Sequence, residues 1–247
     1  MRSRVLVIGD SCVDEFVYGN SVRLCPDAPV PVFTPTDHTC VGGMCSNVKS
    51  NIEALGIECN VLHQRIDVTK TRYVDKKTNH TFLRVDTGEE CIDRIDLIQL
   101  SCIHEYDAIA ISDYDKGFLY EEDIEYICNN HPLVFIDTKK HIGLFCANAA
   151  YIKINEVEYE TSKKELLKKI YNDNLIVTLA NKGCRYKDDI FPVNSVDIKD
   201  MSGAGDTFMA GLIVEYIKTK SIIDAIKYAN ICATNVVQKR GVAVVDL

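Results

Sequence analysis

The sequence of 247 residues lacks three features that would each have pointed to a function. It has no Cys-x-x-Cys pair, no excess of basic residues, and no apolar run near the roughly 18 residues that span a bilayer. The net charge of −8 argues against a general nucleic-acid binder, which presents a basic face. We therefore expect neither a nucleic-acid nor a membrane partner. Phosphorylated ligands are not excluded, because a few lysines and backbone amides can hold them.

The cysteines point to a reducing environment. There are 11 of them, an odd and scattered set. Residues 2–9 read as a first strand, too short for a signal peptide with its cleavage site. Unpaired cysteines without an export signal predict a cytoplasmic location. The alternative is that the cysteines bind a metal ion, but the spacings between them do not match those of known metal sites.

Short apolar runs alternate with segments of helical character. The runs, rich in Val, Ile or Leu, are residues 5–8, 108–111, 133–136 and 175–179. Such runs are typical of strands buried on both faces of a parallel sheet. Helical segments lie between them, at 47–55, 121–128 and 163–171. The alternation predicts an α/β fold with an open, mostly parallel sheet flanked by helices, in one domain over 1–247.

Two stretches break this rhythm and predict a small β lid. Residues 16–33 and 71–85 read as half-exposed antiparallel strands. We place the lid at about 14–35 and 69–87, over the carboxyl ends of the main sheet, where open α/β folds bind ligands. A monomer would leave the edges and the apolar face of this lid exposed. The sequence therefore predicts a homodimer formed through the lid.

A glycine-rich turn stands before the clearest helix of the chain. Gly203-Ala204-Gly205-Asp206 precedes an apolar helix at 207–218, and a second helix follows at 221–238. Such a turn exposes backbone N–H groups at the positive end of the helix dipole, which binds anions. Asp206 could take the proton of an attacking hydroxyl beside a bound phosphate. The alternative is an ordinary helix cap.

This pattern resembles the signature of the ribokinase-like (PfkB) carbohydrate kinases, and further motifs of that family follow in the family's order. They are Gly42-Gly43-Met44-Cys45-Ser46-Asn47 for GGxxxN, Asn155-Glu156-Val157-Glu158 for NxxE, and Val177-Thr178-Leu179 with Lys182-Gly183 on the nucleotide side. Ala180 stands where a glycine is usual. The motifs cover nearly the whole chain, so together they are far more specific than any one of them.

The resemblance implies an ATP-dependent sugar kinase. Asp206 would be the general base, and Gly203, Ala204 and Gly205 the anion hole. Glu158, with Asn155, would organise Mg²⁺ through its waters, as the reluctance of this ion to lose water favours. On the nucleotide side the resemblance places Thr178, Lys182, Gly183 and Asn230. A capped helix start is the alternative for Asn155 and Glu158.

Polar residues near the first strand are candidates for the sugar site, because buried sugar hydroxyls need hydrogen-bond partners. Asp10 and Asp14 follow that strand. Gly42 and Gly43 would let the backbone approach the sugar, with Asn47 one turn along. The alternative for Asp14 is a turn residue or a cap.

Within the family, the sequence is most similar to kinases of heptose 7-phosphate. The segments that carry this likeness are Gly9-Asp10-Ser11-Cys12-Val13-Asp14, Tyr18-Gly19, Pro26-Asp27-Ala28-Pro29-Val30-Pro31-Val32, Lys70-Thr71-Arg72, Leu83-Arg84-Val85-Asp86 and Ser112-Asp113-Tyr114-Asp115-Lys116-Gly117. The likeness places Asp113 in the acceptor site. A phosphorylated acceptor needs cations near the lid, and Lys70, Arg72, Arg84 and Lys116 are candidates. The alternative for each is a solvated surface charge.

The sequence also departs from that pattern. Between residues 62 and 69 it passes almost directly from a strand to the lid, where related kinases carry an extra helix–strand unit. The nucleotidyltransferase domain of the bifunctional heptose enzymes has no counterpart here. Two rival functions stay open: a kinase of an unphosphorylated hexose, pentose or nucleoside, and a noncatalytic sugar or nucleotide sensor. The intact turn at Asp206 argues against the sensor.

Overall fold

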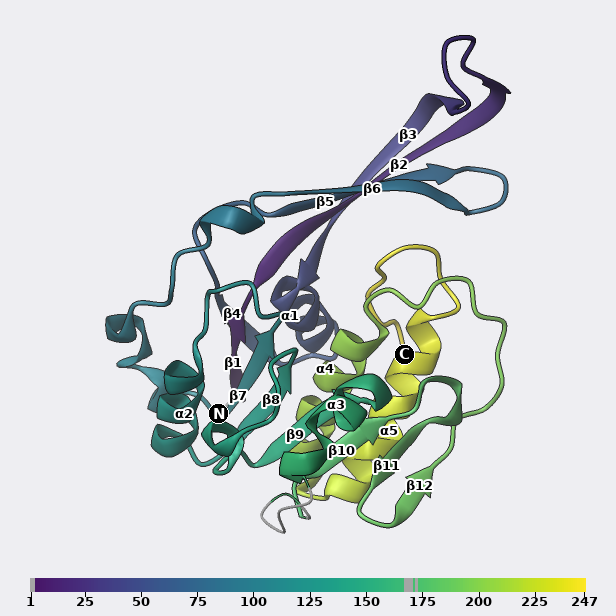
Figure 1. Ribbon diagram of the computed structural model, residues 1–247. Helices are drawn as coiled ribbons and strands as arrows, with labels where there is room; N and C mark the ends of the chain where they lie inside the picture. Colours follow the sequence, from purple (N-terminus) through teal and green to yellow (C-terminus); the bar gives the residue numbers. More distant parts are fainter. Residues whose placement is uncertain (1–2, 167–170, 172) are drawn as a thin grey trace.

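The body of the protein is built on an eight-stranded sheet (Figure 1). The computed structural model describes residues 3–166, 171 and 173–247. The strand order is β12-β11-β10-β9-β8-β7-β1-β4. Six strands are parallel: β1 (Arg4–Gly9), β4 (Glu58–Leu62), β7 (Ala108–Asp113), β8 (Val134–Thr138), β9 (Tyr151–Asn155) and β10 (Leu175–Thr178). The antiparallel strands β11 (Cys184–Tyr186) and β12 (Asp189–Phe191) complete one edge.

Helices cover both faces of this sheet. On one face α1 (Cys45–Ala54), α4 (Ala204–Thr219) and α5 (Ile222–Val236) pack in one apolar core. On the other face α2 (Glu121–Asn130) and α3 (Glu156–Leu166) pack in a second core. Strand residues alternate between the two, so that Val5 and Val7 enter the first core and Leu6 and Ile8 the second. In the described part of the chain no helix is both long and apolar enough to cross a membrane.

The predicted α/β fold is therefore confirmed, although the bounds of the individual elements are shifted. The strand predicted at 175–179 ends at Thr178. The helix predicted at 163–171 begins earlier, at Glu156, because Asn155 and Glu158 exchange hydrogen bonds that start it there. The last part of that predicted helix, at 167–170, lies outside the described residues.

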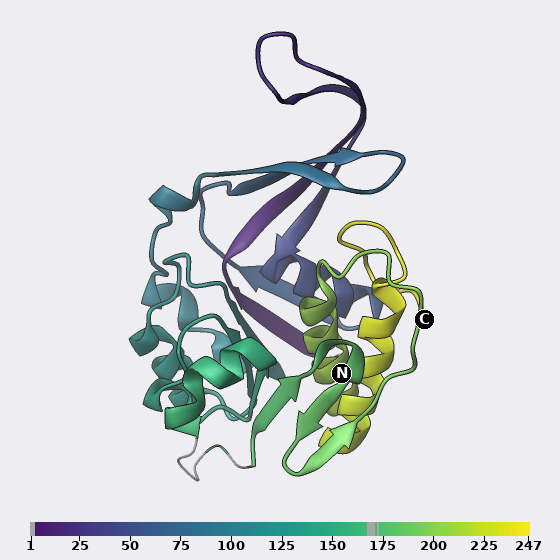
Figure 2. The ribbon, with the colours of Figure 1, turned by 45° about the vertical axis from the view of Figure 1, so that its right-hand side comes forward.

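A separate four-stranded sheet stands over the body, with hairpin tips that project beyond it (Figures 1 and 2). Its order is β3-β2-β5-β6, with β2 (Ser11–Leu24), β3 (Pro31–Met44), β5 (Thr69–Asp75) and β6 (Thr81–Thr87). Both hairpins are antiparallel, but β2 and β5 pair in parallel. The expectation of antiparallel strands throughout is thus wrong at the centre. The reason is that β2 and β5 follow the parallel strands β1 and β4, and so leave the main sheet in the same direction.

The short connection at 63–68 is fixed by one glutamine. Gln64, 3% exposed, accepts a hydrogen bond from the Ser11 N–H at 3.0 Å and donates one to the Ser11 carbonyl oxygen at 2.6 Å. It thereby ties this connection to the point where β1 passes into β2. In the part of the chain that the structure describes, the main sheet ends on this side at β4, and no further strand covers its edge.

The small sheet has an inner and an outer face, which alternate along its strands. The inner face carries Asp14 opposite Lys70 and Phe16 opposite Arg72, and all four side chains are largely buried. The outer face carries the intervening residues, among which Val13, Leu83 and Val85 are exposed. The inner face thus gathers the charged groups Asp14, Lys70 and Arg72 toward the body, and the outer face presents apolar side chains to solvent together with a few polar ones.

Candidate active site

The carboxyl ends of the parallel strands bring four of the predicted residues to one edge of the main sheet. Asp10 directly follows β1, and Asp113 ends β7 in register with Thr138 at the end of β8. Asn155 ends β9 in register with Thr178 at the end of β10. This is the edge at which open α/β sheets bind ligands.

The glycine turn begins α4 and has no side chains that would block it. Gly203 has φ +79°, a left-handed conformation that favours glycine. A Cβ there would lie 2.6 Å from the Asn47 Nδ2 atom, and a Cβ at Gly205 would lie 2.9 Å from the Lys153 Nζ atom. The Ala204 N–H already donates to the Met201 carbonyl oxygen at 3.2 Å. The next N–H groups of the helix start are those that a helix cannot satisfy internally.

Asp206 is the third residue of α4 and is buried, with 4% of its surface exposed. Its Oδ2 atom accepts a hydrogen bond from Asn47 Nδ2 at 3.0 Å, and its Oδ1 atom one from the Tyr114 hydroxyl at 2.8 Å. Burial raises the pKa of this carboxyl to about 6, although the donors Asn47 and Tyr114 and the charge of Lys153 partly oppose the rise. A carboxylate with such a pKa suits a general base near neutral pH.

Asn47 connects the turn to the predicted sugar side. The Asn51 amide donates to Asn47 Oδ1 at 3.0 Å, which orients Asn47 so that its own N–H groups point to Asp206. Gly43, at the end of β3, must lack a side chain, because a Cβ there would lie 2.0 Å from the Asp14 Oδ2 atom. Asp14 in turn pairs with Arg72. Gly42, the exposed neighbour, would meet Ser46 at 3.0 Å.

A buried ion pair lies beneath the turn, and the sequence reasoning missed it. Lys153 Nζ and Asp137 Oδ2 are 2.6 Å apart, and the two residues are 4% and 6% exposed. The second carboxylate oxygen, Asp137 Oδ1, is buried without a hydrogen-bond partner among the described residues. The signal in the sequence was a lysine inside the apolar strand β9 and an aspartate inside β8, where isolated charges are costly.

Tyr114 was also missed, although its segment was singled out. Its hydroxyl donates to Asp206, and its backbone N–H donates to Asp10 Oδ2 at 2.7 Å. Asp10 accepts a second, longer bond from the Lys116 N–H at 3.4 Å, and its Oδ1 atom is buried without a hydrogen-bond partner among the described residues. Burial, and then the charge of Asp113, raise the pKa of Asp10. Asp10 therefore holds the loop that presents Tyr114.

Asp113 is fixed in the same loop region. It is 1% exposed, and both of its carboxylate oxygens lie 3.1 Å from Lys140 Nζ. The Thr138 hydroxyl and the Asp115 N–H also donate to it. These contacts position the loop and leave Asp113 few free lone pairs.

Each of the four predicted cations has an acidic partner. Glu89, which the sequence reasoning did not identify, bridges Lys70 at 2.7 Å and Lys116 at 2.6 Å. Arg84 binds Asp86 through two nitrogens, and Lys70 approaches Asp86 at 3.5 Å. The fourth cation, Arg72, pairs with Asp14. Four cations and three carboxylates leave this cluster one positive charge in excess.

The residues predicted to organise magnesium form a reciprocal helix cap. The Asn155 N–H donates to Glu158 Oε2 at 2.7 Å, and the Glu158 N–H to Asn155 Oδ1 at 2.8 Å. The other oxygen of Glu158 binds Lys139. Burial lowers the pKa of Lys139, but the charges of Asp137, Glu158 and Asp206 outweigh this and raise it. The Lys139 ammonium thus interacts electrostatically with three carboxylates.

A cavity of about 710 Å³ lies beside α5 and includes one of the four residues predicted for the nucleotide side. Asn230 lines it and donates to the Phe191 carbonyl oxygen at 2.9 Å. Gly183 (φ +90°) packs against the same carbonyl, which a Cβ would meet at 2.0 Å. Thr178 ends β10 and donates to the Ile154 carbonyl oxygen, and Lys182 is exposed; neither lines the cavity.

A family model described as "pfkB family carbohydrate kinase" matches residues 38–246. The chain belongs to the pfkB family of carbohydrate kinases. It is therefore a phosphotransferase with an alcohol group as acceptor. The resemblance noted in the sequence is confirmed at the level of the family.

Known relatives of this pfkB kinase support the same assignment. It is 31% identical over 298 aligned positions to the bifunctional protein HldE of Sulfurimonas denitrificans and 29% identical over 296 to that of Nitratiruptor sp.. These alignments cover 99% and 100% of this chain but 62% and 64% of the relatives, so the chain spans less than two thirds of their length. The aligned lengths also exceed the 247 residues of the chain, so the relatives contain segments without a counterpart here.

Solved structures share the fold at low identity. The ribokinase of Thermotoga maritima superposes with a TM-score of 0.72 at 17% identity, covering 98% of this chain and 95% of its own. Phosphofructokinase-2 of Escherichia coli gives 0.74 at 11% identity, covering 99% and 96%. These likenesses confirm the ribokinase-like fold of the pfkB kinase.

Proposed function

We propose that this pfkB kinase transfers the γ-phosphoryl group of ATP to a hydroxyl of a sugar phosphate such as heptose 7-phosphate, with Asp206 as the general base. The observation that carries the proposal is the hydrogen bond from Asn47 Nδ2 to Asp206 Oδ2, 3.0 Å long. It joins the Gly42–Asn47 segment, on the predicted sugar side, to the Gly203–Asp206 turn on the predicted phosphate side.

The residues then divide the chemistry as follows. The acceptor hydroxyl gives its proton to Asp206 while its oxygen forms a bond to the γ-phosphorus, and the bond from that phosphorus to the β,γ-bridging oxygen breaks to release ADP. The N–H groups of the glycine turn and the Lys153 ammonium face the negative charge of the transferred group. Asn47 keeps Asp206 in place.

Magnesium fits the carboxylates at this edge of the sheet. Asp137 Oδ1 is a buried oxygen without a partner among the described residues. Glu158 lies near it, because the charges of Asp137 and Glu158 both act on the Lys139 ammonium and raise its pKa. Asp137 directly, and Glu158 through water, would hold the ion. When bound, Mg²⁺ supplies charge neutralisation on the phosphates of ATP.

For ATP, the cavity beside α5 is the proposed place of the adenine. It is concave, and Asn230 offers an amide among apolar neighbours that include Phe191 and Ile231. The ribokinase of Arabidopsis thaliana, whose fold matches with a TM-score of 0.67 at 13% identity, has been solved with ribose and ATP. That ligand pair belongs to the neighbour and supports the choice of ATP here.

For the acceptor, the charged inner face of the small sheet supports a phosphate group. Lys70, Arg72 and Arg84 lie on this face, and Lys116 joins them through Glu89. The excess positive charge of the cluster suits an anion, and arginine suits bidentate phosphate contacts. In this proposal the small sheet acts as a lid over the sugar.

The test is ATP consumption by the purified chain over pairs of each sugar phosphate and its free sugar. We expect kcat/KM to favour heptose 7-phosphate over the free heptose by at least about 100-fold, since each lost charged contact costs about 1.5–3 kcal/mol. Arg72→Gln should shrink that ratio, whereas Lys49→Gln, at a surface pair on α1, should not. Equal turnover of the free sugar and the sugar phosphate would rule out a phosphorylated acceptor. Absence of ATP turnover with every acceptor would contradict the proposed kinase activity.

Tyr114→Phe is expected to shift the acid limb of the pH–rate profile upward. The change removes a donor to the Asp206 carboxylate, and so raises the pKa of this group above its value of about 6. A hydrogen bond to a charged group is worth about 1.5–3 kcal/mol, so the limb should move by about one to two pH units. The measurement is kcat/KM from pH 5 to 9 in the variant and the wild type. An unmoved limb would show that Tyr114 does not act on Asp206.

The homodimer remains part of the proposal. The outer face of the small sheet exposes Val13, Leu83 and Val85, and β3 and β6 form its open edges. A second copy would cover both features, as the sequence led us to expect.

A further inference from the structure

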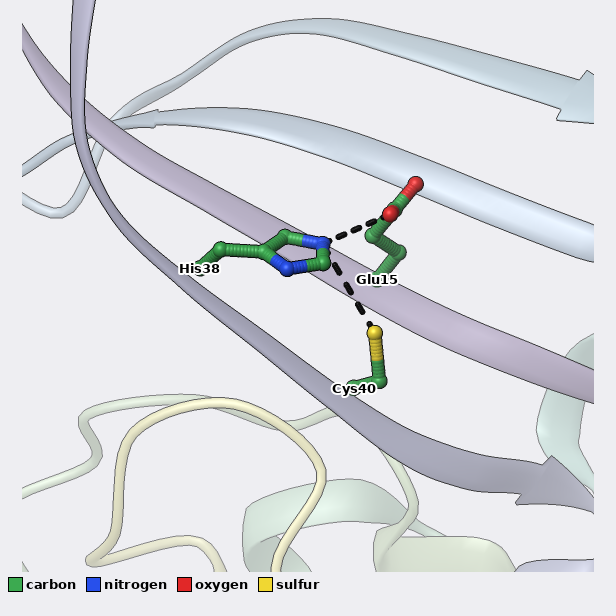
Figure 3. Close-up of side chains that lie close together, drawn as sticks. All are labelled: Glu15, His38 and Cys40. Carbon is green, nitrogen blue, oxygen red and sulfur yellow. Dashed lines mark hydrogen bonds and ion pairs between the residues drawn. The ribbon is translucent and has the colours of Figure 1, made fainter.

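Three side chains that bind metal ions in other proteins meet on the outer face of the small sheet (Figure 3). Glu15 on β2 lies opposite Cys40 on β3, and His38 lies two residues along β3 on the same face. Their nearest ligand atoms all lie within 4.8 Å of one another. Asp14 and Arg72 occupy the opposite face, so this group is separate from the proposed sugar site.

The distances fit a tetrahedral metal ion. His38 Nε2 is 3.6 Å from Cys40 Sγ and 2.6 Å from Glu15 Oε1. For Zn²⁺, bond lengths of about 2.3 Å to sulfur and 2.0 Å to nitrogen place these two ligands about 3.5 Å apart at the tetrahedral angle. The nitrogen–sulfur pair already has that spacing. The nitrogen–oxygen pair would open by less than about 1 Å to reach its own edge of about 3.3 Å.

The carboxylate is held ready for such an ion. The Thr71 hydroxyl donates to Glu15 Oε2, which leaves Oε1 toward His38. Partners of this kind behind a ligand typically orient it and strengthen metal binding.

The donor set also selects the class of metal. Ca²⁺ and Mg²⁺ take oxygen ligands, whereas one thiolate, one imidazole and one carboxylate suit Zn²⁺ and similar transition-metal ions. His38 and Cys40 are exposed in the single chain, so an ion can enter from solvent before a second copy covers this face, and a water molecule can take the fourth position. Within the described residues this is the one group of three or more such side chains that come together.

We propose that Glu15, His38 and Cys40 bind one Zn²⁺-class ion on the outer face of the small sheet, with water as the fourth ligand. The ion would cross-link β2 to β3 near the base of their long hairpin. It would stiffen the hairpin whose other face carries Asp14. This site is independent of the catalytic Mg²⁺ and of the proposed kinase activity.

The experiment is a titration of the metal-free full chain with Co²⁺, followed by displacement with Zn²⁺. Co²⁺ bound to a thiolate gives a charge-transfer absorption in the near ultraviolet, which reports the Cys40 ligand directly. We expect one equivalent of saturable binding per chain and full displacement by one equivalent of Zn²⁺. Neither readout depends on ATP or sugar turnover.

Three variants and one matched control complete the design. Cys40→Ser should abolish the charge-transfer band, and His38→Gln and Glu15→Gln should each weaken binding by more than the roughly 10–100-fold that loss of an outer partner costs. Cys91→Ser removes another exposed cysteine and should leave binding unchanged. Circular dichroism verifies that each variant folds. No saturable binding by the wild type, or binding by Cys40→Ser equal to that of the wild type, would overturn the proposal.

Discussion

Asp206→Asn is expected to lower kcat by about 10²–10⁴, the usual contribution of a positioned general base. The asparagine keeps the shape of the side chain and can keep both of its bonds. Its carbonyl oxygen can accept from Asn47, and its amide can donate to the hydroxyl of Tyr114, which rotates freely. ATP affinity should therefore stay within a few-fold of the wild-type value. The measurements are single-turnover phosphoryl transfer and direct titration with ATP.

The same variant should unfold at a higher temperature than the wild type at neutral pH. Burial raises the pKa of Asp206 from 3.8 to about 6, so the ionised form costs folding stability above pH 6 and the cost disappears as the pH falls toward 3.8. A shift of about 2 units corresponds to at most about 3 kcal/mol. The gain in melting temperature should thus be largest above pH 7 and small near pH 4. Wild-type turnover in this variant would remove Asp206 from the mechanism.

Lys153→Met is the second change with a large expected effect. The variant removes the buried charge beneath the glycine turn, where a Cβ at Gly205 would lie 2.9 Å from Lys153 Nζ. Loss of one such charge-stabilising group typically lowers kcat by about 10²–10³. It also leaves Asp137 buried without its partner, which costs about 3–5 kcal/mol of stability.

A double variant separates these two effects. Lys153→Met with Asp137→Asn removes both charges. The melting temperature of this double variant should therefore return most of the way to the wild-type value, while kcat stays low. Lys218→Met, on the exposed end of α4, is the control for loss of a lysine and should turn over like the wild type. If Lys153→Met folds and keeps wild-type kcat, its ammonium does not act on the transferred group.

The sequence predicted the fold class and the turn at Asp206, because both depend on local patterns. Buried strands read as apolar runs, and Gly203 marks a helix start by its own backbone conformation. The pairing of Asn47 with Asp206 joins residues far apart in the chain. The sequence analysis placed each of the two residues in the site, but it did not predict the hydrogen bond between them.

What the sequence could not predict are contacts made between strand ends. Lys153 and Asp137 meet because β8 and β9 are neighbours in the sheet, which spacing along the chain does not reveal. Tyr114 reaches Asp206 through a loop whose course depends on Asp10. The parallel pairing of β2 with β5 was likewise hidden, because it is set by the directions of β1 and β4.

General-base catalysis by Asp206 requires contact between its carboxylate and the acceptor hydroxyl. A crystal structure of the ternary complex tests this contact most directly. The complex would contain a nonhydrolysable ATP analogue, Mg²⁺ and heptose 7-phosphate. We expect one hydroxyl of the sugar within about 2.6–3.2 Å of an Asp206 oxygen, in line with the γ-phosphorus over the Gly203–Gly205 turn. A complex in which Asp206 keeps only its bonds to Asn47 and Tyr114, with the sugar hydroxyls and the γ-phosphate elsewhere, would contradict the account.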